Sequence, residues 1–571
     1  MAIIRTGQFV TMEDRAPRVE AVAVDGARIL AMGTLAEVEA ELAAAGVTAE
    51  VDRTFEGLVV LPGLIDQHLH PILGASTLAS EVIAIEDWVL PDRTFAAATT
   101  PEEYRARLAA AATALDASDP SGAEILFSWG YHALWHGPID RAALDAIAAS
   151  RPIVIWQRSC HEWVLNSAAI ARIGVTEAQM QGHGEASTMV DWAGGHWWEQ
   201  GMNLLLPALT PHILTPERMT RGLTQLVATL HANGVTAVNE PGALFTPDLW
   251  RLYQAILGAD DTPFATSFLV DGRSQVDRGV ALDDVLADAE QQIALAPPGG
   301  GKLEFFDHQI KLFADGAIIS QLMQMHDPYL DADGRPDPAH TGEWLIEPDV
   351  LRERVRRFWV AGYQIHCHVN GDEALSVLLD ILETCMVEHP RPDHRTVIVH
   401  FATSTTELID RIARLGAIVS ANPYYTTRFA DEYGRVGLGP ERADHMVRSA
   451  SVLARGIPLS FHSDLPMGPS SPLGFVWCAV NRRTVSGRVA APEERIGVHD
   501  ALRAVTIEAA YSWRREHEIG SILPGKLARF TVLAEDPYAV DPEHIRDIRV
   551  VGTVFDGRWF PVADRGPITA G

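Results

Sequence analysis

The sequence predicts an α/β protein built on a (β/α)8 barrel of the TIM type, and three observations support this prediction. Short apolar runs rich in β-branched residues alternate with helical patterns, and such alternation is typical of a parallel sheet. The number of these units suits a closed barrel. An open doubly wound sheet is the second choice, because no Gly-x-Gly-x-x-Gly motif follows an early strand. The strand-like runs of the middle of the chain are IVIWQR, GVTAVNE, FATSFLV, FFDHQIKLF, YQIHCHV, TVIVHFA, AIVSANP and IPLSFHSD.

Both ends of the chain resemble each other and differ from the middle. Short apolar runs bounded by Gly, Pro or Asp predict a few strands at each end. We therefore expect residues 1–60 and 515–571 to build one small β-sandwich domain, and residues 61–514 to form the barrel. Residues 75–220, rich in Ala, Trp, Gly and His, break the alternation and are predicted to contain an insertion over the barrel mouth. The stretch APPGGGK at 296–302 predicts a loop.

Composition excludes several classes of protein. The 571 residues carry 46 Lys and Arg against 75 Asp and Glu, a net charge of −29, which repels nucleic acids and anionic membranes. Four cysteines without CxxC spacing favour a reducing cytoplasm over a disulfide scaffold. No apolar run approaches 18 residues and the start lacks a basic leader. The chain is thus expected to be a soluble cytoplasmic protein without a nucleic-acid or membrane partner.

Residues of the metal-ligating type recur where the strand-like runs end. In a (β/α)8 barrel these ends meet on one face, where the chemistry lies. One buried histidine is more often structural than a ligand, but a succession of such residues on one register predicts a metal site. They are His68 and His70, Lys311, His366 and His368, His400, and Asp464.

Lys311 is the most informative of these residues, because it lies inside an apolar run. Burial of an amine lowers its pKa and makes the neutral form reactive. A neutral amine can add carbon dioxide, and the resulting carbamate can bridge two cations that activate a water. The alternative is an ion pair between Lys311 and Asp315. Imidazole and carboxylate ligands suit zinc, while manganese, iron and nickel also fit. Asp464 could both bind a metal ion and move a proton between water and the leaving group.

Five motifs in this order resemble the amidohydrolase superfamily, and more narrowly the amidohydrolase-3 branch that includes N-substituted formamide deformylases. The motifs are LPGLIDQHLH, IKLFADG, HVNGDEA, VIVH and SDLP. The segment SCHEWVLNSAAI resembles part of that branch's insertion, and the likeness covers about residues 55–557. One departure is Val399-His400-Phe401-Ala402, where relatives usually have Glu-His-Ala-Gln; it concerns the substrate pocket rather than a ligand.

The resemblance implies a role for each motif residue. His68 and His70 would hold one ion, carbamylated Lys311 would bridge, and His368 with His400 would hold the second. Asp464 would be a ligand of the first ion and the general acid/base, in a hydrolysis of an amide-like C–N bond by a metal-bridging hydroxide. The resemblance also implies two zinc ions, a (β/α)8 barrel with a small β-sandwich, and a homodimer.

Several further residues are candidates for substrate contact, and three of them have a plainer alternative. Asn166 could cap a helix, Trp129 could anchor the packing of the insertion, and His366 could support a ligand instead of touching substrate. His462, two residues before Asp464, is predicted to orient a ligand. The candidates are His161, Asn166, Trp129, Glu240 and His366.

Two other functions fit part of the pattern. A deaminase or a hydrolase of cyclic amides or lactones could use the same ligands with a different pocket. A non-catalytic binding protein could retain the scaffold, but the presence of both Lys311 and Asp464 argues against it.

Overall fold

The computed structural model describes residues 1–243, 246–295 and 301–563 and divides the chain into two compact units. Among the described residues, the first unit comprises Met1–His70, Leu230–Asp464 and 470–563, and the second comprises Pro71–Thr229 and Leu465–Pro469. Most of the predicted loop at 296–302, and the last residues of the predicted small domain, 564–571, lie outside the described part.

The first unit contains the predicted barrel, a sheet of eight parallel strands that is nearly closed. Neighbouring strands follow one another along the chain, as successive β–α units require. One prediction was wrong: IVIWQR is not a barrel strand but lies in the sheet of the second unit, and the first barrel strand is the short Leu64–Asp66. In sheet order the strands are β20 (Leu459–Phe461), β19 (Ile418–Ala421), β18 (Val397–His400), β17 (Gln364–Val369), β16 (Leu303–Phe313), β15 (Ala265–Asp271), β14 (Val235–Ala243) and β5 (Leu64–Asp66).

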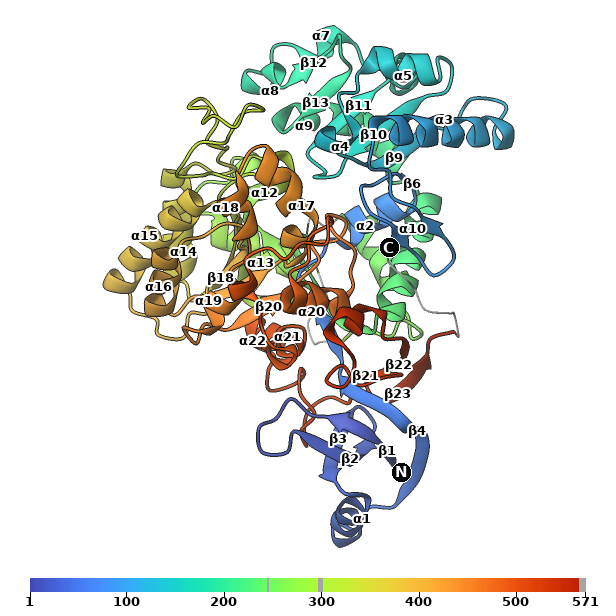
Figure 1. The fold of residues 1–571 in the computed structure, drawn as a ribbon, viewed down its shortest axis with the longest axis vertical. Helices are drawn as coiled ribbons and strands as arrows, with labels where there is room; N and C mark the ends of the chain where they lie inside the picture. Colours follow the sequence, from blue (N-terminus) through green and yellow to red (C-terminus); the bar gives the residue numbers. More distant parts are fainter. Residues whose placement is uncertain (244–245, 296–300, 564–571) are drawn as a thin grey trace. The chain divides into compact units, whose positions relative to one another are not determined.

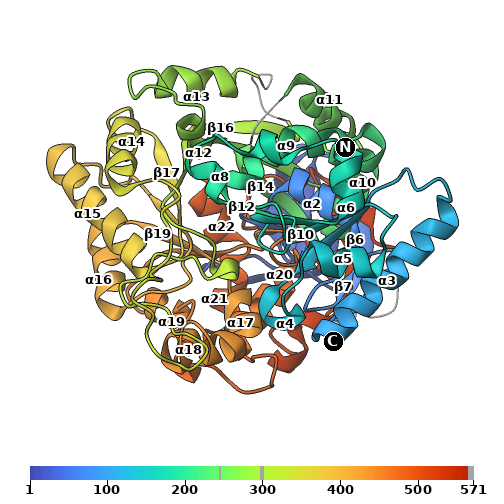
Figure 2. The same cartoon turned by 90° about the horizontal axis from the view of Figure 1, so that it is seen from above.

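Helices cover the outside of this sheet, as α14, α15 and α16 do beside β17 to β19 (Figure 2). The sequence of α16 (Thr406–Leu415) accounts for its ends: the Thr405 hydroxyl accepts from the N–H of Leu408, and Gly416 takes the left-handed conformation after the last turn. Leu408, Ile409 and Ile412 lie on one buried face. The other helices of the first unit are α1 (Leu35–Ala44), α11 (Pro247–Ile256), α12 (Gly272–Asp277), α13 (Val285–Ile293), α14 (Pro348–Val360), α15 (Asp372–Glu388), α17 (Tyr424–Arg435), α18 (Pro440–Asp444), α19 (Ser449–Leu453), α20 (Pro472–Asn481), α21 (Val498–Ala504) and α22 (Ile507–Ser512).

Asp66 connects the first and last barrel strands. Its carboxylate accepts hydrogen bonds from the N–H and hydroxyl of Ser463, at 2.9 and 2.5 Å, and from the hydroxyl of Ser470 at 2.5 Å. The N–H of Asp464 donates to the carbonyl of His68 at 2.9 Å. These bonds place the segment after β5 beside the segment after β20, and so bring His68 next to Asp464.

The two ends of the chain meet in one seven-stranded sheet (Figure 1). Its central strand β4 pairs with β1 in parallel and with β21 in antiparallel orientation. Phe9 and Phe530, from opposite ends of the sequence, pack edge to face with ring centroids 6.0 Å apart. In order the strands are β23 (Arg558–Pro561), β22 (Val550–Phe555), β21 (Phe530–Leu533), β4 (Ala49–Pro62), β1 (Ala2–Val10), β2 (Arg18–Asp25) and β3 (Arg28–Gly33).

The second unit has its own six-stranded sheet and its own core, in which Tyr104, Leu108, Leu144 and Ile153 are fully buried. The predicted location of this segment over the barrel mouth remains a prediction. The strands are β12 (Val190–Asp191), β13 (His196–Trp198), β11 (Glu162–Leu165), β10 (Ile153–Gln157), β9 (Leu126–Tyr131) and β6 (Glu81–Val82), and a separate hairpin joins β7 (Trp88–Val89) to β8 (Thr94–Phe95). The helices are α2 (Pro71–Leu78), α3 (Pro101–Ser118), α4 (Ala133–His136), α5 (Arg141–Ile147), α6 (Ser167–Ile173), α7 (Glu177–Met180), α8 (Glu185–Thr188), α9 (Gln200–Ile213) and α10 (Pro216–Ala232), which runs into the first unit.

Among the described residues, none of the helices has the length and apolar character needed to span a membrane.

Candidate metal centre

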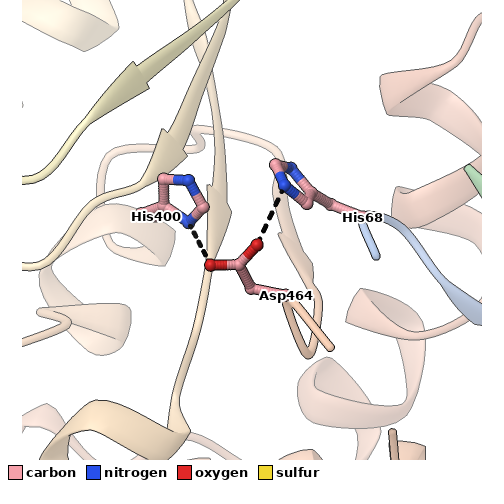
Figure 3. A group of neighbouring side chains, drawn as sticks. All are labelled: His68, His400 and Asp464. Carbon is pink, nitrogen blue, oxygen red and sulfur yellow. Dashed lines mark ion pairs between the residues drawn. The ribbon is translucent and has the colours of Figure 1, made fainter. Parts of the chain in front are cut away.

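His68, His400 and Asp464 converge at the carboxyl ends of the barrel strands (Figure 3). One potential ligand atom from each lies within 4.8 Å of the others. Asp464 Oδ1 is 3.2 Å from His68 Nε2, and Asp464 Oδ2 is 3.8 Å from His400 Nδ1. All three side chains are buried. Residues almost 400 positions apart thus form one compact donor set.

His70 joins the same carboxylate, because its Nε2 lies 3.3 Å from Asp464 Oδ1. On the other side of the ring, His70 Nδ1 is 3.8 Å from Glu240 Oε1, and the second oxygen of Glu240 accepts a hydrogen bond of 2.8 Å from the hydroxyl of Tyr253. Burial lowers the pKa of His70, but the hydrogen bonds and charges of Asp464 and Glu240 outweigh it and raise the pKa to about 9. Glu240 is buried and contacts a predicted ligand; its predicted contact with substrate stays a prediction.

Lys311 on β16 is fully buried, and its Nζ has no hydrogen-bond partner among the described residues. The alternative ion pair with Asp315 is not formed within that part of the chain. The Asp315 carboxylate instead accepts from the backbone N–H groups of Gln324, Asn370 and Gly371 at 3.0, 2.9 and 2.7 Å. Burial lowers the pKa of Lys311 to about 7. A large neutral fraction near neutral pH is what carbamate formation requires.

The second histidine pair is divided between two depths of the barrel. The ring of His368 lies 4.4 Å from that of His400, and the side-chain amide nitrogen of Asn370 is 2.9 Å from His368 Nε2. His366, two residues earlier, places its Nε2 2.9 Å from Gln309 Oε1. Burial lowers the pKa of His366 to about 3. His368 is therefore the member of the pair that lies beside the other predicted ligands.

The donor set fits a divalent cation. Burial is the main cause that lowers the pKa of His68 and His400 well below its usual value, so both imidazoles are neutral and carry a lone pair. Lys311 Nζ and His68 Nε2 are buried and lack a hydrogen bond within the described residues; the 3.2 Å approach of His68 Nε2 to Asp464 lacks hydrogen-bond direction. Unpartnered buried polar atoms are costly, and a cation among them would remove that cost.

The remaining candidates lie in the second unit. Asn166 caps α6 as its plainer alternative predicted: its Oδ1 accepts from the N–H groups of Ile153 and Ala169, and its Nδ2 donates to two carbonyls. His161 is partly exposed, with Nδ1 2.9 and 3.0 Å from the two oxygens of Glu199. Trp129 is fully buried and packs on Trp88 with ring centroids 5.1 Å apart. Substrate contact by these three residues stays a prediction.

Sequence reasoning missed several polar neighbours of the predicted ligands. Gln67 and Ser420 are buried polar residues inside motifs that were already singled out, IDQHLH and AIVSANP, and that mismatch with an apolar run was the available signal. Tyr253 lies on α11, where an aromatic residue at helical spacing gave no signal. Ser420 bonds to Gln67 and to His462, and Tyr253 bonds to Glu240.

The amidohydrolase family matches residues 55–560 of the chain. The chain belongs to the amidohydrolase family. This amidohydrolase is 24% identical to the putative amidohydrolase YtcJ of Bacillus subtilis over 98% of both chains. It is 26% identical to the N-substituted formamide deformylase of Arthrobacter pascens over 96% of both chains. It is also 26% identical to the protein LONG AFTER FAR-RED 3 of Arabidopsis thaliana, over 94% of this chain and 87% of that protein.

Solved structures share the fold of this amidohydrolase. A metal-dependent hydrolase from Pyrococcus horikoshii superposes with a TM-score of 0.71 at 20% identity, over 95% of this chain and 99% of the other. One from Pyrococcus furiosus gives a TM-score of 0.66 at 20% identity, over 94% and 100%. Family and fold confirm the predicted resemblance and the predicted barrel. This amidohydrolase is a hydrolytic enzyme that acts on C–N bonds of a small-molecule substrate and uses a divalent metal.

Proposed function

We propose that this amidohydrolase cleaves the amide-like C–N bond of a small N-substituted or aromatic substrate, with Asp464 as the general acid/base. The observation that carries the proposal is the position of the Asp464 carboxylate. One oxygen faces His68 and His70 at 3.2 and 3.3 Å, and the other faces His400 at 3.8 Å. A carboxylate that faces three imidazoles is well placed to ligate a cation beside them and to exchange a proton. His70 would lose its ring proton when it binds that cation.

The proposed cofactor is a pair of zinc ions. His68, His70 and Asp464 would hold the first, His368 and His400 the second, and carbamylated Lys311 would bridge them. Bound cations of this kind polarise a carbonyl group and lower the pKa of a water molecule toward neutrality. The bridge is supported by the buried, unpartnered amine of Lys311 and by its lowered pKa.

The proton transfers fall to residues of the chain. Asp464 accepts a proton from the attacking water as the new C–O bond forms, and delivers it to the nitrogen as the C–N bond breaks. The products are a carboxylic acid and an amine, so atoms and charges balance. Glu240 and Tyr253 hold the ring of His70 on its far side, which keeps His70 Nε2 directed at Asp464.

The substrate class rests on the relatives and on a short set of side chains. The formamide deformylase of Arthrobacter pascens, at 26% identity, supports an N-substituted amide. His161 is the strongest of the predicted substrate contacts, because it is partly exposed and Glu199 orients its ring through Nδ1. Asn166, Trp129, Glu240 and His366 are buried, and they remain the less accessible of the proposed substrate contacts. We also propose that the enzyme is cytoplasmic and forms a homodimer.

The test is a substrate screen with the metal content measured alongside. Zinc-loaded protein, chelator-treated protein and the Asp464→Asn variant are offered formamides, N-acyl amines, cyclic amides, lactones and aminated heterocycles. We expect zinc-dependent release of an amine from the open-chain amides, and none from the variant. Full activity of metal-free protein would end the proposal, and turnover of only the aminated heterocycles, cyclic amides or lactones would replace it with the corresponding alternative.

A further inference from the structure

A buried chain of hydrogen bonds connects Gln67, Ser420, His462 and His400. The Ser420 hydroxyl donates to Gln67 Oε1 at 2.7 Å and lies 2.8 Å from His462 Nδ1. His462 Nε2 lies 3.1 Å from His400 Nδ1. The four side chains are almost fully buried, so no bulk water competes for these bonds. We call this set of four side chains the relay. It runs from Gln67, after β5, through Ser420 on β19 and His462, just after β20, to His400 on β18.

The first bond sets the direction of all the others. A serine hydroxyl has one proton, so once Ser420 donates to Gln67 it can only accept from His462 Nδ1–H. A neutral imidazole carries one ring proton, so His462 Nε2 then accepts a hydrogen bond from His400 Nδ1–H. The same N–H lies 3.8 Å from Asp464 Oδ2. The lone pair of His400 is therefore on Nε2.

We propose that Gln67, Ser420 and His462 are positioning residues that hold His400 as the Nδ1–H tautomer and so present its Nε2 as a metal ligand. Reversal of the Gln67 amide would reverse every bond and place the proton of His400 on Nε2, where it would block ligation. His462 also stacks on His68, with ring centroids 4.9 Å apart and planes at 21°, so one imidazole contacts a predicted ligand of each ion. The inference deepens the proposed function, since it rests on His400 as a ligand.

One matched pair of variants, one ring substitution and one control separate the hydrogen bonds from packing. Ser420→Ala removes the hydroxyl, and Ser420→Thr restores it. His462→Phe keeps a ring against His68 but removes both nitrogens. His394→Asn is the control, because His394 is an equally buried imidazole that bonds to Thr396 Oγ1 and the Leu415 carbonyl ahead of β18, away from the relay.

The first measurement is the ¹⁵N chemical shifts of the histidine rings in the metal-free enzyme, with His400 assigned by its loss in His400→Gln. We expect His400 protonated at Nδ1 in the wild type and in Ser420→Thr, and a mixture of tautomers in Ser420→Ala. Wild-type His400 protonated at Nε2 would overturn the relay without any variant having to fold.

The second measurement is zinc affinity by chelator competition, with stoichiometry by elemental analysis. Ser420→Ala and His462→Phe are expected to weaken the ion bound by His400 on the order of 10–100-fold, while Ser420→Thr and His394→Asn bind as the wild type does. Wild-type affinity together with a wild-type spectrum in Ser420→Ala refutes the relay and leaves the proposed function standing. Failure of the wild type to bind zinc refutes the proposed function, and the tautomer of His400 is still measured.

Discussion

The two histidine pairs, His68/His70 and His366/His368, have the same spacing but different surroundings. Both members of the first pair face one oxygen of Asp464, at 3.2 and 3.3 Å. In the second pair only His368 lies beside His400, while His366 bonds to Gln309 one layer deeper. An identical motif therefore yields a converging pair in one place and a divided pair in the other.

The physical reason is the position of each pair relative to its strand. β5 ends at Asp66, so His68 and His70 lie in the segment that follows and can both turn toward Asp464. β17 runs from Gln364 to Val369, so His366 and His368 are both held on the pleat of a strand. Side chains two apart on a strand share a face but differ in height along it by two residues, and only the upper one reaches the carboxyl end.

The largest expected effect comes from Asp464, the residue that the first pair shares. Asp464→Asn removes the proton acceptor while keeping the shape, so kcat should fall on the order of 10²- to 10⁴-fold. Much of the metal should remain on the histidines, which elemental analysis would show. Near wild-type turnover at full metal content would mean that another group moves the proton.

Alanine substitution in each pair tests the comparison directly. His68→Ala should remove one equivalent of metal, because it deletes a buried ligand that contacts Asp464. His366→Ala should retain the full metal content, since His366 Nε2 is engaged by Gln309. Metal content is read from dialysed protein by elemental analysis. Loss of a full equivalent in His366→Ala would show that the deeper histidine is the ligand.

Asp315 holds the turn after the second pair, and the conservative change Asp315→Asn should destabilise it. The carboxylate accepts three backbone N–H groups through two oxygens, whereas an amide offers one oxygen and turns an N–H₂ toward at least one donor. We expect a loss of about 2–3 kcal/mol in the free energy of unfolding. Urea denaturation measures it, with the exposed Asp333→Asn as control; equal stability of the two variants contradicts the assignment.

Lys311 should give the metal-free enzyme a distinctive dependence of stability on pH. Burial lowers its pKa from a usual 10.5 to about 7, so the unfolded chain binds a proton that the folded one does not across this range. Stability then falls as pH decreases from about 10.5 to 7, with a slope approaching about 1.4 kcal/mol per pH unit. Denaturation of wild type and Lys311→Met at several pH values would show the slope vanish in the variant. The same slope in both proteins would mean that the Lys311 amine is hydrated and keeps its usual pKa.

Much of the architecture follows from the sequence alone. Alternation of apolar strands and helices predicted the barrel, because each period of the hydrophobic pattern is a local property of the chain. The order of the histidine, lysine and aspartate motifs predicted the family. Their positions at strand ends predicted that these side chains lie close together, since the strand ends of a barrel share one face. The two-residue repeat of a strand accounts for the division of the second pair.

Only the tertiary structure decided which groups face one another. The carboxylate of Asp464 lies between His68 and His70 because Asp66 ties the first barrel strand to the last, across almost 400 residues. Asp315 was an alternative partner of Lys311, but the folded chain engages it with three backbone N–H groups. The relay from Gln67 through Ser420 and His462 to His400 likewise joins distant segments. Such contacts depend on side-chain direction and distance across the closed barrel, which no local pattern in the chain encodes.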